Sequence, residues 1–321
     1  MTYYDVFNGD ADGICALHQL RLHEPADDAV LVTGVKRDIA LLARVHAGEG
    51  DRVTVLDVSF DKNRDGVKRL LEAGAAVRYI DHHYAGELPE HPNLEVLIDT
   101  ASDVCTALLV DARLEGRYRP WAVAAAFGDN LTDAALRAAG PLQLNERQLE
   151  SLKELGICLN YNGYGASVDD LFFTPDDLYR RLRPYTNPFV FMVEDPAYEE
   201  LREGFHADMA RAESLRPELE TDTYAVYVLP DAKWSRRVGG VYGNALARRR
   251  PERAHALLSM LPDGNYQVSV RSPTANPEGA DDLCRQFPTG GGRKAAAGIN
   301  ALPADRFDAF IAALQAAYGK N

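Results

Sequence analysis

The first 100 residues alternate between short apolar runs and amphipathic segments. The apolar runs have the length of β-strands and predict strands over 3–7, 29–34, 52–58, 76–80 and 94–98. Helical spacing between these runs predicts helices over 13–22, 38–46 and 61–73. Gly74 stands where the last of these helices is expected to stop. Because strands that alternate with helices form parallel sheets, we expect a doubly wound, mainly parallel α/β domain.

After the last of these strands the hydrophobic spacing becomes helical. Ser102 and Asp103 can cap a helix that continues to Leu114, and Pro120 can begin another that reaches Phe127. Two later segments also have helical spacing, at 146–159 and 175–182. These helices are expected to complete the first domain.

Strand signals return in the last third of the chain. The features that we interpret there are strands at 224–229 and 266–272, a glycine triplet at 290–292 and an amphipathic helix at 305–318. A charged helical stretch precedes them. We therefore predict a catalytic domain over 1–193, a linker helix over 194–218 and a smaller C-terminal α/β domain over 219–321.

Composition narrows the class of protein. A chain of 321 residues with 46% apolar residues is long enough for two folded cores. The net charge of −13 argues against a long passive groove for duplex nucleic acid. The N-terminus lacks a signal-peptide pattern and no apolar run reaches the roughly 20 residues of a membrane span, so we expect a cytoplasmic protein. The cysteines are far apart and predict buried thiols in a reducing compartment: Cys15, Cys105, Cys158 and Cys284.

Acidic side chains gather where the predicted strands end. In an open α/β sheet, the carboxyl ends of the strands meet at one edge, and ligands bind there. Crowded carboxylates are costly unless cations neutralise them, and oxygen ligands with one imidazole suit Mn²⁺ or Mg²⁺. Each Asp alone could instead be a helix cap or a turn residue, but their coincidence at one edge favours a metal site. The candidates are Asn8, Asp10, Asp12, Asp57, Asp81, His82, His83 and Asp129.

These residues lie in motifs that resemble those of the DHH phosphoesterases, in the order that the family has. "NGDADG" resembles motif I, "LDVSF" motif II, "YIDHH" the motif that names the family, and "FGDN" motif IV. "VSVRS" followed by "TGGGRKAAAG" resembles the glycine-rich signature of the DHH-associated C-terminal domain, which binds substrate. The resemblance spans roughly residues 3–300.

The resemblance implies a centre with two Mn²⁺ ions per chain, with Mg²⁺ as the other option. One ion would be held by Asn8, Asp10 and Asp57, and the other by Asp12, Asp57, His82 and Asp129. Asp81 would orient an imidazole, and His83 would act as a catalytic residue beside the scissile phosphate. The residues implied in substrate binding are Ser269, Arg271, Ser272, Gly290, Gly291, Gly292 and Arg293.

Two residues depart from the family pattern. Asn8 stands where the family usually has His or Asp, and Arg293 stands where the glycine signature usually continues with His. The amide brings no negative charge, and the guanidinium replaces a titratable group with a fixed cation. Both changes put the level of activity in question.

We expect a metal-dependent phosphoesterase that hydrolyses phosphodiester or phosphomonoester bonds in nucleotides or short single-stranded oligonucleotides. We expect no membrane partner and leave homodimerisation open. The first alternative is a RecJ-like single-strand exonuclease. The second is a degenerate family member that binds nucleotide or nucleic acid without hydrolysis.

Two further features lie near these motifs. Lys36 and Arg37 follow the second predicted strand, and they could either reach the same cleft or begin a solvated helix. The stretch "LNYNGYGASVDDLFF" at 159–173 is rich in Asn, Gly and Tyr within a helical context. We expect it to border the cleft, and its residue types indicate no particular mechanism.

Overall fold

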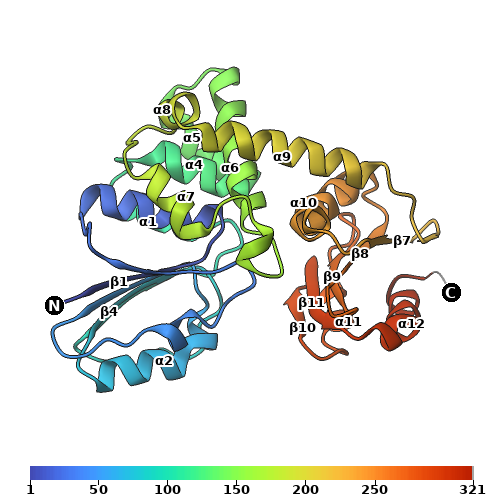
Figure 1. Cartoon of the computed structure of the whole chain (residues 1–321), viewed down its shortest axis with the longest axis horizontal. Helices are drawn as coiled ribbons and strands as arrows, with labels where there is room; N and C mark the ends of the chain where they lie inside the picture. The colour runs from blue at the N-terminus through green and yellow to red at the C-terminus, as the bar shows by residue number, and fades with distance from the viewer. Residues whose placement is uncertain (320–321) are drawn as a thin grey trace. The chain divides into compact units, whose positions relative to one another are not determined.

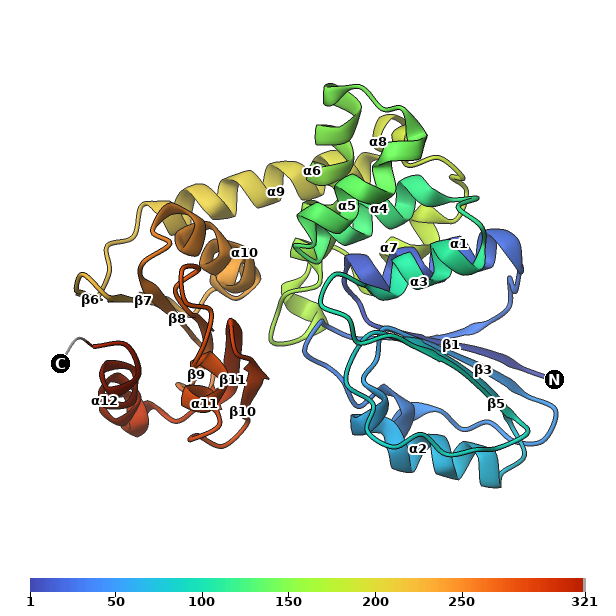
Figure 2. The same cartoon turned by 180° about the vertical axis from the view of Figure 1, so that it is seen from behind.

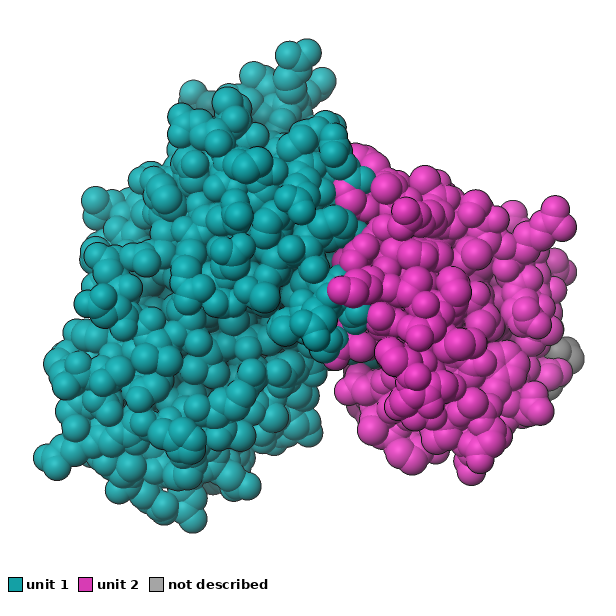
Figure 3. Space-filling model, in the orientation of Figure 1, with its two compact units in different colours: residues 1–163, 167–203 teal, residues 164–166, 204–321 magenta. Residues whose placement is uncertain are grey.

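The computed structural model describes residues 1–319 as two compact units. Unit 1 contains residues 1–163 and 167–203, and unit 2 contains residues 164–166 and the chain from 204 onward (Figure 3). The division falls inside helix α9 (Pro196–Glu213), which lies within the charged stretch predicted as a linker helix. Among the described residues, no helix combines the length and the apolar character that crossing a membrane requires.

Unit 1 is built on a five-stranded parallel sheet with the order β2-β1-β3-β4-β5. The strands are β1 (Tyr3–Phe7), β2 (Val30–Val32), β3 (Arg52–Leu56), β4 (Ala76–Asp81) and β5 (Leu94–Ile98). Helix α1 (Ala11–His23) lies on one face of the sheet and α2 (Phe60–Glu72) on the other (Figures 1 and 2). The order reverses between β1 and β3, so the sheet is doubly wound, as the sequence predicts.

The rest of unit 1 is helical and lies mainly on the α1 face (Figure 1). The α-helices that follow β5 are α3 (Thr106–Arg113), α4 (Arg119–Gly128), α5 (Thr132–Ala139), α6 (Glu146–Asn162), α7 (Pro175–Leu182) and α8 (Pro188–Glu194). Short 3₁₀ turns lie at Leu41–Arg44, Gly140–Leu142 and Val168–Asp170. Gly74 follows α2 with a φ of +84°, which a residue without a side chain adopts at little cost.

The helix predicted over 38–46 is wrong, because only the 3₁₀ turn Leu41–Arg44 forms there. Asn63 on α2 explains the difference. Its side chain accepts the backbone N–H of Leu42 at 3.1 Å and donates to the carbonyl of Ile39 at 2.6 Å. A regular helix would instead have paired the N–H of Leu42 with the carbonyl of Asp38, and the carbonyl of Ile39 with the N–H of Ala43. The segment instead seats Leu41 and Leu42 in the core beneath α2.

The predicted cap of the next helix is also wrong. Ser102 and Asp103 precede a loop, and α3 begins at Thr106 without a cap from its own neighbours. The side chain of Asp12 takes that role, since it accepts the N–H groups of Thr106 and Ala107 at 2.8 and 2.7 Å. A carboxylate from α1 therefore fixes the start of α3.

Helices α4 and α6 approach each other closely through small residues. A Cβ atom added at Gly156 of α6 would lie 1.9 Å from the carbonyl oxygen of Ala124 on α4 and 2.9 Å from the nitrogen of Gly128. Only glycine therefore fits at position 156. Because α4 ends just before Asp129, this close packing sets the position of that carboxylate.

Unit 2 is a mixed sheet with the order β10-β11-β9-β8-β7-β6, in which only β7 and β8 pair in parallel. Its strands are β6 (Leu219–Glu220), β7 (Tyr224–Leu229), β8 (Ala254–Met260), β9 (Tyr266–Arg271), β10 (Gly290–Arg293) and β11 (Ala296–Leu302). Its helices are α10 (Lys233–Arg249), α11 (Ala280–Cys284), the 3₁₀ turn Ala304–Arg306 and α12 (Phe307–Tyr318). Helices α11 and α12 pack on the core face of this sheet. This second sheet confirms the predicted second α/β region.

His18 gives unit 1 a pH-dependent stability. It lies buried on α1, where its Nε2 bonds the carbonyl of Tyr185 at 2.8 Å and its ring meets Trp121 edge-on. Burial lowers its pKa from 6.5 to about 4. The unfolded chain takes up a proton below pH 6.5 and the folded chain does not, so stability falls as the pH drops from 6.5 to 4, by about 3 kcal/mol.

We expect His18→Gln to flatten this pH dependence, because glutamine can still donate to Tyr185 but does not titrate. Urea unfolding of unit 1 at several pH values between 4 and 6.5 measures the slope. The control is His91→Gln, which changes an exposed imidazole. An unchanged slope in His18→Gln would contradict the assignment.

Candidate metal centre

The candidate residues meet where the sheet order reverses. Asn8, Asp10 and Asp12 follow the carboxyl end of β1, and Asp57 follows the neighbouring strand β3. Asp81 ends β4, and His82 and His83 come directly after it. Residues 8, 10, 12, 57, 81 and 82 are all buried. The predicted strand-end cluster is therefore a real group of neighbours in unit 1.

The two carboxylates of the DxD turn are each fixed at the start of a helix. Asp10 caps α1, because its Oδ1 accepts the N–H groups of Asp12 and Gly13 at 3.0 and 3.1 Å. Asp12 accepts the first two N–H groups of α3. Backbone N–H groups at a helix N-terminus favour an ionised carboxylate. Both side chains are thus held in one orientation before any ligand binds.

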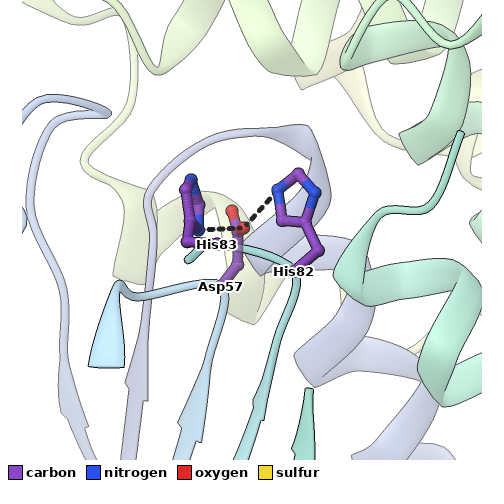
Figure 4. Close-up of side chains that lie close together, drawn as sticks. All are labelled: Asp57, His82 and His83. Atoms are coloured by element: carbon purple, nitrogen blue, oxygen red, sulfur yellow. Dashed lines mark ion pairs between the residues drawn. The ribbon is translucent and has the colours of Figure 1, made fainter. Parts of the chain in front are cut away.

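Three carboxylates surround one imidazole nitrogen. The Nε2 of His82 lies 3.4 Å from Asp57 Oδ1, 3.9 Å from Asp12 Oδ2 and 3.9 Å from Asp129 Oδ2. Figure 4 shows the imidazoles of His82 and His83 on either side of the Asp57 carboxylate. Possible ligand atoms lie within 4.8 Å of one another in two groups that share His82, as the ligands of one ion do: Asp12, His82 and Asp129, and Asp57, His82 and His83.

The tautomer of His82 follows from its other nitrogen. Nδ1 lies 2.8 Å from the carbonyl oxygen of Val104, which can only accept, so the proton is on Nδ1. Nε2 is therefore the ring nitrogen that faces Asp12, Asp57 and Asp129, and it can bind a cation when the ring is neutral. This is the arrangement of a metal-binding histidine whose second nitrogen is held by a backbone carbonyl.

His83 and Asp81 form a hydrogen-bonded pair beside the cluster. The Nδ1 of His83 lies 2.7 Å from Asp81 Oδ1 and 3.8 Å from Asp57 Oδ1. Asp81 is fully buried, whereas 36% of the His83 side chain is exposed. A buried carboxylate that holds one ring nitrogen fixes the orientation of the imidazole. The pair has the geometry of an oriented acid or base.

The electrostatics of the cluster differ from residue to residue. Burial raises the pKa of Asp57 well above its ordinary value, and the neighbouring Asp12 and Asp10 carboxylates raise it further. Burial also raises the pKa of Asp12, although the imidazole of His82 opposes the shift. Burial would raise the pKa of Asp10 as well, but the Lys36 ammonium outweighs it, and the net pKa is lowered. The cluster therefore lacks positive charge around Asp57 and has it beside Asp10.

Lys36 enters the cluster, which settles the alternative between cleft and solvated helix in favour of the cleft. Its ammonium donates to Asp10 Oδ2, to Asp129 Oδ1 at 3.2 Å and to the side-chain oxygen of Asn160 at 3.1 Å. Asn160 comes from α6 and lies in the Asn-rich stretch at 159–173. One residue of that stretch, Asn160, therefore contacts the centre.

Asn8 turns its amide toward the same lysine. Its Nδ2 donates to the backbone carbonyl of Lys36 at 3.3 Å, and its buried Oδ1 has no hydrogen-bond partner within residues 1–319. A buried acceptor without a partner is costly, and a cation is one way to satisfy it. The donor chemistry of Asn8 and its neighbours thus fits a hard divalent cation.

The residues predicted to bind substrate lie in unit 2, and several are engaged within it. Arg271 donates to the side-chain oxygens of Asn244 and Ser269 and to the carbonyls of Val270 and Gly240. Ser272 donates to the carbonyl of Lys294 at 2.7 Å. The other predicted residues are the triplet Gly290, Gly291 and Gly292 and the exposed Arg293, which form the edge strand β10. The triplet is thus a strand rather than a turn.

Sequence reasoning missed two partners of the centre. The role of Asn160 could not be predicted because its helix, α6, is distant in sequence from every motif. The one feature of the sequence that indicated it is the unusual composition of 159–173. The carbonyl of Val104, which fixes His82, carries no signal at all, because any residue type offers a backbone carbonyl.

Comparisons with known proteins place this fold. No family model and no curated protein matches the chain. Among solved structures, exonuclease RecJ bound to manganese aligns over 98% of this chain and 89% of its own, with a TM-score of 0.66 and 18% identity. This chain has the fold of RecJ.

Two other structures extend the comparison. RecJ in complex with Mn²⁺ from Thermus thermophilus aligns over 98% of this chain with a TM-score of 0.68 and 19% identity, and this chain spans 51% of that RecJ. CDC45 from Entamoeba histolytica aligns over 98% of this chain and 95% of its own, with a TM-score of 0.52 and 10% identity. The RecJ likeness extends over both units and supports the predicted α/β fold with two sheets.

Proposed function

We propose that this protein is a divalent-metal-dependent phosphoesterase that hydrolyses phosphodiester or phosphomonoester bonds in nucleotides or short oligonucleotides. The observation that carries the proposal is the convergence of Asp12, Asp57 and Asp129 on the Nε2 of His82. The fold shared with a manganese-bound RecJ exonuclease supports the same class of chemistry.

In this proposal, Asp12, Asp57, His82 and Asp129 hold a Mn²⁺ or Mg²⁺ ion. A divalent ion bound there would neutralise the buried carboxylates, polarise a phosphoryl oxygen and make water more acidic. The sequence also predicts a second ion with Asn8, Asp10 and Asp57. Lys36 already donates to Asp10. The centre could therefore hold either two divalent ions, or one divalent ion beside the Lys36 ammonium, and these are distinct hypotheses.

The remaining steps fall to residues of the chain. His83, held by Asp81 through Nδ1, would protonate the leaving oxygen. Asp10 and Asp12 would keep their orientation through the helix starts that they cap. The predicted phosphate contacts of unit 2 remain part of the proposal: Ser269, Arg271, Ser272, Gly290, Gly291, Gly292 and Arg293.

Each of the two alternative functions is supported by a specific observation. The RecJ likeness favours a single-strand exonuclease. The neutral Asn8 and the ammonium of Lys36 favour a member that binds nucleotide or nucleic acid without hydrolysis, because both reduce the negative charge offered to a cation.

A substrate panel tests the proposal. We expect the metal-free protein to be inactive and added Mn²⁺ to restore hydrolysis of nucleotide and dinucleotide esters. A length series from dinucleotides to long single strands separates the two enzymes, since an exonuclease gains activity with length and a short-substrate enzyme loses it. Absence of hydrolysis across the panel at saturating Mn²⁺ would favour the non-hydrolytic alternative.

A further inference from the structure

Lys36 is held in place at its backbone as well as at its ammonium. Its N–H donates to the carbonyl of Gly163 at 2.8 Å, and its own carbonyl accepts the side-chain amide of Asn8 at 3.3 Å. The side chain is 24% exposed, although lysine usually extends into solvent. Residues that follow β1 and α6 thus fix the backbone of Lys36. These contacts within unit 1 also set the position of its ammonium group.

The ammonium has the surroundings of a bound cation. Its acceptors include carboxylate oxygens of Asp10 and Asp129 and the amide oxygen of Asn160. Oxygen atoms of this kind are also what Mn²⁺ and Mg²⁺ bind. A divalent ion at Asp10 Oδ2 would therefore share its ligand with a positive charge in a poorly solvated site, and like charges repel strongly there.

The neutral side chain of Asn8 also favours an ammonium over a second divalent ion. A carboxylate at this position would add a negative charge beside Asp10, and the centre would then need more positive charge than one ammonium supplies. The amide adds none. A neutral ligand and a built-in ammonium on the same side of the cluster compensate each other, whereas each alone would leave the charge unbalanced.

The opposite side of the cluster keeps the full set of metal ligands. Asp12, Asp57 and Asp129 approach Nε2 of His82. Asp129 does so through Oδ2, whereas its Oδ1 accepts from Lys36. We propose that the Lys36 ammonium takes the place of one of the two divalent cations, so that this centre is complete with one divalent ion per chain. The inference rests on the proposed function, because it presumes the metal centre.

Metal content tests the inference directly. The full chain is freed of metal with a chelator, dialysed to equilibrium against Mn²⁺ and analysed for bound manganese per chain. We expect one bound ion in the wild type, with the electron paramagnetic resonance spectrum of an isolated Mn²⁺. Two bound ions with an exchange-coupled spectrum would overturn the inference and leave the proposed function standing. No bound ion would contradict the metal centre itself.

Variants test whether Lys36 is the reason for the single ion. We expect the double variant Lys36→Met with Asn8→Asp to bind two ions and to show the coupled spectrum, because the ammonium is gone and a carboxylate is added. The matched control is Lys68→Met, which removes an exposed ammonium on α2. We expect this variant to bind one ion, as the wild type does. A folded double variant that still binds one ion would show that Lys36 does not occupy the second position. If the double variant does not fold, the wild-type ratio decides alone.

Discussion

Asp57→Asn is expected to abolish turnover, by at least about a thousand-fold, without unfolding the protein. Asp57 lies between the two imidazoles, 3.4 Å from Nε2 of His82 and 3.8 Å from Nδ1 of His83. An amide offers one neutral oxygen where the carboxylate offers two that share a charge, so the affinity for a divalent ion should fall with the activity. Initial rates with Mn²⁺ and the bound manganese measure both effects.

The fold should survive because the Asp57 carboxylate destabilises the metal-free folded protein. Its pKa is raised well above its ordinary value by burial and by neighbouring carboxylates. When folding raises the pKa of a carboxyl group, the unfolded chain ionises first as the pH rises above about 4, the pKa of that group in the unfolded chain. The folded protein therefore loses stability as the pH rises further. The asparagine variant lacks this penalty. Asn also tolerates the left-handed backbone of Asp57, whose φ is +57°.

We therefore expect the metal-free asparagine variant to unfold at a temperature equal to or above that of the metal-free wild type at neutral pH. The control is Asp65→Asn, which makes the same chemical change at an exposed position on α2. Equal turnover of Asp57→Asn and wild type would refute the assignment of this centre as the catalytic one.

Gly156→Ala is expected to destabilise unit 1 by about 3 kcal/mol and to weaken Mn²⁺ binding at least tenfold. The added Cβ atom would lie 1.9 Å from the carbonyl of Ala124, so α6 must move away from α4. Asp129 directly follows α4, and Asn160 lies one turn further along α6. The movement would separate Asp129 from Asp12 and His82, and Asn160 from Lys36.

Urea unfolding and a Mn²⁺ titration measure the two effects. Trp121 on α4 is fully buried, and in a Trp234→Phe background its fluorescence reports unit 1. The control is Gly48→Ala, since a Cβ there would come no nearer than 3.7 Å to the carbonyl oxygen of Ala73. We expect that control to change the free energy of unfolding by less than about 0.5 kcal/mol. Equal stability of the Gly156 and Gly48 variants would contradict the packing argument.

The sequence predicted most elements of unit 1 because their patterns are local. Strands β1 and β5 and helix α7 have the predicted bounds, since alternation, Pro175 and flanking turn residues act within a few positions. Strand β8 was missed. Its sequence, "AHALLSM", is buried on both faces and shows no alternation, and alanine and leucine favour helices. Only its place between β7 and β9 makes it a strand.

The candidate centre was predictable where a motif carries the ligand, and not where the fold brings in a distant partner. Asp57 lies near the end of the strand predicted over 52–58, and His82 follows the strand predicted over 76–80, so their meeting follows from the parallel sheet. The contact between Lys36 and Asn160 joins residues 124 positions apart. It depends on how tightly α6 packs on α4, which no local pattern encodes. The capping of α3 by Asp12 was missed for the same reason.

The helix starts capped by Asp10 and Asp12 also affect how such sequences evolve. Losing either cap would cost about 1 kcal/mol or more whether or not the protein catalyses anything. Selection for folding alone would therefore preserve "NGDADG" in a lineage that had abandoned hydrolysis. Asp57, whose charge destabilises the metal-free fold, has no such protection and would drift first. Among relatives of this protein, an intact DxD turn is weak evidence of an enzyme, and an aspartate at position 57 is strong evidence.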